Sequence, residues 1–128
     1  MKLLLDTHTF LWAIHGDDNL SEVAGNAFIN PDNTLYLSAV SYWEISIKQR
    51  IGKLGLISNW HTLIDQEMAA NQIQWLPIDK SHCLAMIDLP EIHRDPFDLL
   101  LIAQAQCEGM TLVTKDQNIA RYSVKTLW

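Results

Sequence analysis

The sequence predicts an α/β protein whose parallel sheet is covered by helices on both faces. Short apolar runs that suit buried strands alternate with segments in which apolar residues recur at helical spacing. The length agrees with this class, because 128 residues with a mass of 14.6 kDa form one compact domain that buries a core without disulfides. We therefore expect one domain over residues 1–128.

The predicted strands are short and rich in leucine, valine and threonine. The first, residues 2–5 (KLLL), is too short for a helix and stops at Asp6. Residues 34–38, 110–114 and 124–127 share this character, and a weaker candidate covers residues 73–78. Pro77 in the weaker candidate favours the end or the edge of a sheet.

Six segments between the strands have the apolar spacing of amphipathic helices: residues 7–15, 22–29, 40–51, 60–71, 81–87 and 96–108. The last is the clearest. Pro96 suits the first helical position, and Gly109 follows the last turn. Strands that alternate with helices in this way predict a parallel sheet.

The formal net charge of −6 and the pI of about 5.1 argue against binding of nucleic acid through bulk positive charge. They are compatible with an enzyme that holds a phosphodiester through a metal cation, because such a site must itself be acidic. No apolar stretch suits a membrane span, no signal-peptide pattern is present, and Cys83 and Cys107 lack paired spacing. We expect a soluble cytoplasmic protein without a membrane partner.

Acidic residues stand where predicted strands give way to helices. Asp6 follows the first strand, Glu44 lies one turn into the helix after the second, and Asp116 follows the strand at 110–114. The last predicted helix opens with Asp95 and Asp98, three positions apart on one face. In an open parallel sheet these junctions share one edge, where ligand sites form.

Each of these acids also has a purely structural interpretation. Aspartate is a good helix N-cap, Ser41 and Glu44 match a capping box although Ser38 caps equally well, and Asp98 suits the positive end of a helix. Together, however, crowded carboxylates repel one another and stay ionised only beside a cation. Oxygen ligands without Cys or His favour Mg²⁺ or Mn²⁺, which suits phosphodiester hydrolysis.

Four segments carry most of this pattern: residues 4–8 (LLDTH), 38–45 (SAVSYWEI), 93–105 (HRDPFDLLLIAQA) and 112–116 (LVTKD). In their order and spacing they resemble the motifs of PIN domains, and more narrowly those of VapC-type toxins from bacterial toxin–antitoxin operons. No single motif is specific, but the resemblance covers essentially the whole chain.

The resemblance implies a PIN-like three-layer α/β/α fold with a five-stranded parallel sheet. It also implies an Mg²⁺- or Mn²⁺-dependent endoribonuclease, the toxin of a type II toxin–antitoxin pair, that hydrolyses RNA with a metal-activated water. The implied partners are an RNA substrate, a second copy in a homodimer and a cognate antitoxin that blocks the site.

The family's acidic quartet corresponds to Asp6, Glu44, Asp98 and Asp116 of this chain. By this resemblance three aspartates bind metal and Glu44 binds it directly or through water. The family spacing to the alanines of the last helix selects Asp98 as the third acid. Asp95 is then the helix cap, with direct or outer-shell ligation as the alternative.

Two further groups of residues surround the acids. The hydroxyl side chains expected to hydrogen-bond ligating carboxylates are Thr7, Ser41 and Thr114. The basic residues expected to contact the RNA backbone are Lys48, Arg50, Lys53 and Lys115. Capping explains the first two hydroxyl groups equally well, and Lys48 lies four residues after Glu44, where an ion pair on the helix surface is the alternative.

Three other functions share part of the pattern. A receiver-type phospho-acceptor domain needs an aspartate at the end of a central strand, and residues 55–58 (GLIS) offer none. An aspartate-nucleophile phosphatase needs a second aspartate two positions after Asp6, where His8 stands. A non-catalytic PIN-like binding module should have lost at least one acid, and none is missing. The five histidines form no zinc-binding spacing.

Overall fold

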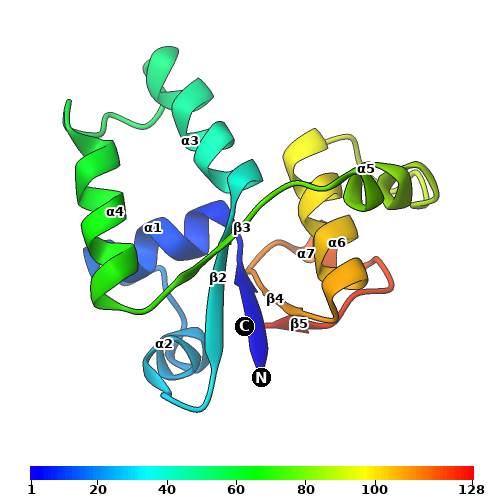
Figure 1. Cartoon of the computed structure of the whole chain (residues 1–128), viewed down its shortest axis with the longest axis horizontal. Coiled ribbons are helices and arrows are strands. Elements are labelled where there is room, and N and C mark those ends of the chain that lie inside the picture. The colour runs from blue at the N-terminus through cyan, green and yellow to red at the C-terminus, as the bar shows by residue number, and fades with distance from the viewer.

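The computed structural model describes residues 1–128, and it is a five-stranded sheet with seven helices. The elements along the chain are β1 (Lys2–Leu5), α1 (Thr7–His15), α2 (Glu22–Ile29), β2 (Thr34–Ser38), α3 (Ala39–Arg50), α4 (Trp60–Ala70), β3 (Gln74–Leu76), α5 (Lys80–Ile87), α6 (Pro96–Glu108), β4 (Thr111–Val113), α7 (Gln117–Ala120) and β5 (Thr126–Leu127) (Figure 1).

The first strand of the chain is the middle strand of the sheet. The strand order is β3-β2-β1-β4-β5, and every neighbouring pair is parallel. Leu5 at the end of β1 stands opposite Leu37 of β2 and Val113 of β4. The carboxyl ends of the three central strands therefore meet at one edge of the sheet.

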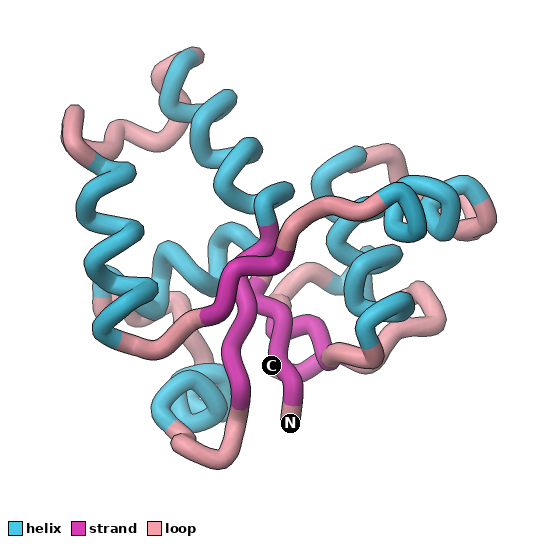
Figure 2. Tube along the Cα trace, viewed as in Figure 1, coloured by secondary structure: helices cyan, strands magenta, loops and turns pink.

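The sheet separates two apolar cores, because successive side chains of a strand point to opposite faces. Leu3 and Leu5 belong to one core, together with residues of α1, α2 and α4, whereas Leu4 belongs to the other, with residues of α6 and α7. Helix α3 contributes Ile45 to the first core and Val40 to the second. Figure 2 shows the strands between these two groups of helices.

The predicted fold class, the five-stranded parallel sheet and all six predicted helices are confirmed. The strands at the carboxyl-terminal end are shorter than predicted, because Met110 and Val124 are apolar and pack in the second core without pairing in the sheet. The short helix α7 was not predicted. With four residues it is too short to show a helical period.

We expect Leu4→Ala to lower the free energy of unfolding by about 2–5 kcal/mol, because it leaves a cavity beneath a fully buried side chain. Leu84→Ala is the matched control, since Leu84 on α5 is 64% exposed and should change stability by less than about 0.5 kcal/mol. Urea denaturation followed by circular dichroism measures both. Equal losses would contradict the placement of Leu4 in the core.

Candidate metal centre

The acidic residues are held where strands end and helices begin. Asp6 follows β1 directly and is the N-cap of α1, and Asp116 follows β4 and is the N-cap of α7. Asp95 is the N-cap of α6, and Asp98 lies in the first turn of that helix. Helix α3 begins after Ser38, the last residue of β2, and carries Glu44.

Three of these carboxylates accept hydrogen bonds from the free N–H groups of the helix that they cap. Asp6 Oδ1 accepts from Thr9 N at 2.8 Å, and Asp116 Oδ1 accepts from Asn118 N at 2.7 Å. Asp95 Oδ1 accepts from the backbone of α6 at 2.9 and 3.1 Å. The capping interpretation of these three residues is therefore confirmed, and Ser38 rather than Ser41 caps α3.

A cavity of about 270 Å³ lies at this edge of the sheet. The residues that line it are Asp6, Thr7, His8, Trp12, Glu44, Lys48, Asp95, Asp98, Lys115 and Asp116. Five carboxylates face two lysines, so the lining has a formal charge of −3 with histidine neutral. Segments from both halves of the chain thus build one acidic cavity.

Glu44 is nearly fully buried, and both of its carboxylate oxygens have partners. The Thr7 hydroxyl donates to Oε1 at 2.6 Å, and the Lys48 ammonium contacts Oε2. The ion pair that was the alternative for Lys48 is therefore present. Thr7 and Lys48 together fix the position of this carboxylate in the cavity.

Asp6 is the most enclosed aspartate of the cavity, with 9% of its surface exposed. Burial raises the pKa of its carboxyl, and the neighbouring Thr114 hydroxyl and the hydrogen bond from Thr9 N only partly offset the rise. A buried carboxylate without a cation is thus destabilised in its charged form. The same carboxylate gains when a cation binds next to it.

Asp98 shows the same effect in a more exposed place. Loss of solvation raises the pKa of Asp98 to about 6, and the charges of Asp95 and Asp116 add to the rise. A hydrogen bond between His93 Nε2 and Asp98 Oδ2, 3.1 Å long, opposes it. The repulsion shows that the three aspartates are close enough to interact.

Of the four basic residues predicted to contact RNA, two line the cavity and two do not. Lys48 and Lys115 line the cavity, whereas Arg50 and Lys53, at the end of α3 and beyond it, are exposed and do not.

The two remaining predicted hydroxyl residues differ in their partners. Thr114 is buried and its hydroxyl accepts from Asp116 N at 3.0 Å. Ser41 is also buried, but its hydroxyl has no hydrogen-bond partner.

Three residues at the site were not predicted from the sequence. His8 and Trp12 line the cavity from the exposed side of α1, and Lys115 Nζ lies 5.9 Å from the centre of the Trp12 ring. His93 contacts Asp98 from the loop before α6. Of the three, only His8 could have been predicted from the sequence, because it stands two residues after Asp6.

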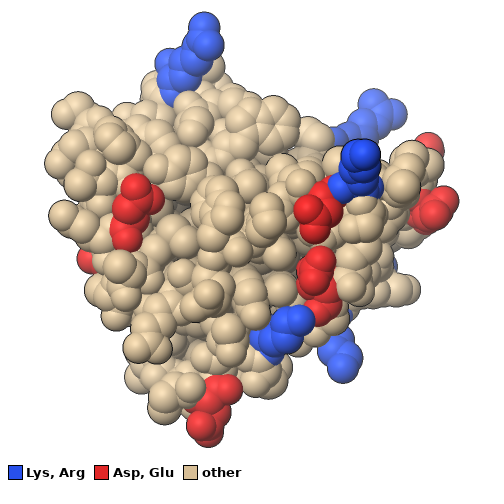
Figure 3. Space-filling view, viewed as in Figure 1, with Lys and Arg blue, Asp and Glu red and all other residues tan.

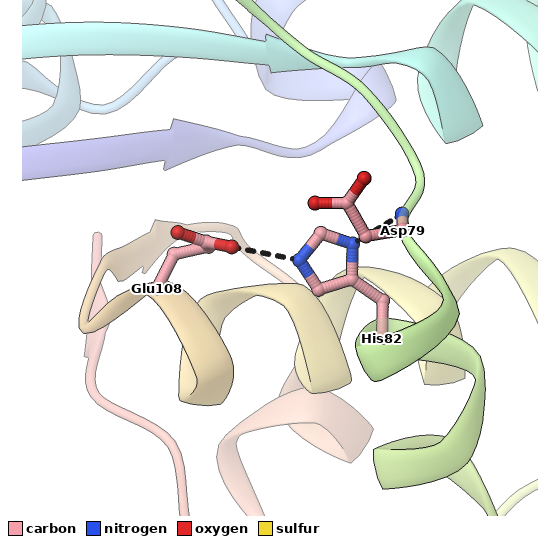
Figure 4. Close-up of side chains that lie close together, drawn as sticks. All are labelled: Asp79, His82 and Glu108. Carbon is pink, nitrogen blue, oxygen red and sulfur yellow. Dashed lines mark hydrogen bonds and ion pairs between the residues drawn. The ribbon is translucent and has the colours of Figure 1, made fainter.

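Asp79, His82 and Glu108 form a second group of possible ligands (Figure 4). None of the three lines the acidic cavity. Both nitrogens of the His82 ring are occupied. Nδ1 accepts from Asp79 N at 3.0 Å, and Nε2 contacts Glu108 Oε1 at 2.9 Å. These contacts join the start of α5 to the end of α6. Because the ring is fully buried and neither nitrogen is free, the group is poorly suited to a metal.

The face of the molecule seen in Figure 3 offers little to attract a polyanion by charge alone. Basic side chains stand singly on the face seen in Figure 3 and form no continuous basic surface there. None of the helices combines the length and the apolar character needed to cross a bilayer.

The donor set of the cavity fits a hard divalent cation. Five carboxylates and one histidine, His8, line it, no cysteine does, and the pKa values of Asp6 and Asp98 are raised. Carboxylate oxygens suit Mg²⁺ and Mn²⁺, whereas zinc prefers sites with nitrogen or sulfur.

In the metal-free protein we expect Asp98→Asn to flatten the dependence of stability on pH. The folded pKa of Asp98 lies above the unfolded one, so the protonated carboxyl stabilises the fold below roughly pH 4 and this contribution is lost as the pH rises through 6. In EDTA, wild type should lose about 1–2 kcal/mol more than the variant between roughly pH 4 and pH 7. Urea titrations at each pH measure the difference, and parallel profiles would contradict the raised pKa.

Comparisons with known proteins agree with this architecture. The model of the PIN domain family matches residues 3–125. The structure of VapBC2 from Rickettsia felis bound to a promoter DNA fragment superposes with a TM-score of 0.75 at 16% identity, covering 98% of this chain and 97% of that chain.

Two other solved structures are similar over nearly the whole chain. VapBC-1 from nontypeable Haemophilus influenzae has a TM-score of 0.58 at 19% identity and covers 98% of this chain and 96% of that chain. VapBC-5 from Mycobacterium tuberculosis, a member of the VapBC family of toxin–antitoxin systems, has a TM-score of 0.59 at 15% identity, with coverage of 98% and 94%. None of the curated proteins matches the sequence. Because the family model spans nearly all of the chain, the protein belongs to the PIN domain family.

Proposed function

We propose that the protein is an Mg²⁺- or Mn²⁺-dependent endoribonuclease and the toxin of a type II toxin–antitoxin pair. The observation that carries this proposal is the cavity in which Asp6, Glu44, Asp98 and Asp116 meet from four separate segments. Membership of the PIN family excludes the receiver-type and phosphatase alternatives. The non-catalytic PIN-like module is disfavoured, because all four acids line one cavity.

In this proposal Asp6, Asp98 and Asp116 bind the cation, and Glu44 binds it directly or through water. A bound divalent cation supplies positive charge to the phosphate and lowers the pKa of an attacking water. Thr7 holds the Glu44 carboxylate in place through its hydroxyl. Asp95 remains the cap of α6 and adds negative charge to the cavity.

The two lysines of the cavity are the proposed contacts to the RNA backbone. Lys48 and Lys115 line the cavity, so a phosphate next to the cation would lie within their reach. Arg50 and Lys53 lie outside it, and in this proposal they contact RNA only beyond the cleaved bond.

Similarity to solved VapBC structures supports the proposal of a cognate antitoxin. The homodimer and the cytoplasmic location are parts of the proposal that rest on the resemblance of the sequence motifs. An apolar cavity between α1 and α4 supports a protein partner as well. Seven of its nine lining residues are apolar, among them Leu11, Ile14, Leu56 and Trp60. Apolar surface of this kind is costly in water and favours a partner.

We expect RNA cleavage to require a divalent cation and to depend on Asp98 more than on Asp95. Asparagine keeps the shape and the capping oxygen of aspartate but removes the charge that a cation needs. Asp98→Asn should therefore lose at least about 100-fold in rate, and Asp95→Asn about 10-fold or less. Cleavage of bacterial total RNA, with Mg²⁺ or Mn²⁺ and with EDTA, measures this.

Asp18→Asn, at an exposed site on the loop after α1, is the control and should cleave like wild type. Full activity in excess EDTA would contradict the metal requirement, and equal severe losses in both aspartate variants would make Asp95 a ligand. Expression of the same variants in a bacterial host tests the toxin role, because only the proteins that cleave RNA should arrest growth.

Replacing Lys48 by methionine should tighten cation binding, because the Lys48 ammonium competes for the Glu44 carboxylate. We expect Lys48→Met to bind Mn²⁺ roughly fivefold more tightly, equivalent to about 1 kcal/mol for a partly exposed ion pair. Its RNA cleavage should nevertheless fall. Lys53→Met, outside the cavity, should bind Mn²⁺ like wild type, as measured by calorimetry. Weaker binding by Lys48→Met would show that Lys48 supports the cation instead.

A further inference from the structure

We propose that His93 is a positioning residue for Asp98, and that Tyr122 determines which nitrogen of the His93 ring carries the hydrogen. The inference deepens the proposed function and rests on it, because Asp98 is a proposed ligand of the cation. Neither His93 nor Tyr122 lines the acidic cavity, so both act through Asp98.

A continuous chain of hydrogen bonds leads from the backbone to the Asp98 carboxylate. His93 N donates to the Tyr122 hydroxyl oxygen at 3.3 Å. The same hydroxyl lies 2.8 Å from His93 Nδ1, and His93 Nε2 lies 3.1 Å from Asp98 Oδ2. All three side chains are largely shielded from water, with His93 13%, Asp98 17% and Tyr122 5% exposed.

The donors and acceptors of this chain are consistent with only one neutral form of the ring. The Tyr122 oxygen already accepts from the backbone N–H, so its own hydrogen is available for Nδ1. Nδ1 then accepts, and the ring hydrogen is on Nε2, from which it donates to Asp98 Oδ2. In the opposite form the lone pair of Nε2 would face the carboxylate, which is repulsive.

The consequence for Asp98 is a fixed carboxylate with one oxygen free. Oδ2 accepts the hydrogen bond from His93, and no protein group hydrogen-bonds to Oδ1. A donor behind a ligating carboxylate restricts its rotation, so that the other oxygen is presented in one direction. Such outer partners of a metal ligand typically account for about 10–100-fold in metal affinity.

Tyr122 also links this chain to a second proposed ligand. It follows α7, the helix that Asp116 caps, and its backbone N–H bonds to Ile119 O at 3.1 Å within that turn. The position of Tyr122 is therefore set by the same short helix that positions Asp116. His93 and Tyr122 thereby connect Asp98 to the helix that Asp116 caps.

The first test uses the wild-type protein without metal. A long-range ¹H–¹⁵N spectrum at pH 8 distinguishes protonated from unprotonated ring nitrogens, and His93→Gln assigns the signals of His93. We expect hydrogen on Nε2 and none on Nδ1. A ring with its hydrogen on Nδ1, or on both nitrogens, would overturn the proposal whatever the protein binds or cleaves.

The second test compares two neutral replacements by their Mn²⁺ affinity. The glutamine amide reaches as far as Nε2 and retains a donor for Asp98, whereas the asparagine amide reaches only as far as Nδ1. We expect His93→Asn to bind Mn²⁺ about 10–100-fold more weakly and His93→Gln to stay within about threefold of wild type. Tyr122→Phe removes the donor to Nδ1, so the form with hydrogen on Nε2 should lose part of its preference and the Mn²⁺ affinity should fall between those of the two His93 variants.

The outcomes separate this inference from the function on which it rests. A wild type that binds Mn²⁺ together with an equal affinity in His93→Asn would overturn the role of His93 alone. Equal losses in His93→Asn and His93→Gln would also overturn it, because a donor would then make no difference. A wild type that fails to bind Mn²⁺ would contradict the proposed function and the metal role of His93 with it. Circular dichroism and melting curves confirm that each variant is folded.

Discussion

The pairing of β1 with a parallel strand on each side is the constraint on which the rest of the structure depends. Parallel neighbours end at the same edge, so residues that follow Leu5, Leu37 and Val113 are brought together although they are far apart in the sequence. The N-terminal ends of α1, α3 and α7, which follow these strands, lie at the same edge of the sheet. The acidic cavity is a direct result of this geometry, and its cost is the burial and mutual repulsion of several carboxylates.

Helix ends reduce that cost. Asp6, Asp95 and Asp116 each accept hydrogen bonds from free N–H groups at the first turn of a helix, where the helix dipole also favours negative charge. Capping and cation binding are therefore compatible uses of one side chain, since a carboxylate has a second oxygen and further lone pairs. The sequence presents the two as alternatives, whereas in the structure the cap positions the carboxylate at the cavity.

The sequence predicted the features that depend on local pattern. The apolar run before Asp6 and the helical spacing after Pro96 gave the strands, the helices and the acids at their junctions. The prediction was less accurate for the ends of β4 and β5, because Met110 and Val124 are as apolar as strand residues yet pack outside the sheet. The roles of the acids at the site remain predictions.

Contacts between distant residues could not be predicted in the same way. His93 and Tyr122 meet across 29 positions through a short helix that has no period of its own. For Lys48 the sequence allowed both an ion pair with Glu44 and a contact to RNA, and only the arrangement of side chains shows that the ion pair forms. Arg50 and Lys53 are close to Lys48 in the sequence, but they lie at the end of α3 and beyond it and do not line the cavity.

The ion pair between Glu44 and Lys48 has a consequence for how the chain acquires its structure. The two residues are one helical turn apart, so their charges can balance as soon as α3 forms, before any strand has paired. Of the five acids that line the cavity, Glu44 therefore has a partner for its charge within its own helix. Burial of this carboxylate therefore needs no ion from solution, whereas no lysine pairs with Asp6 or Asp98, whose pKa values are raised by burial.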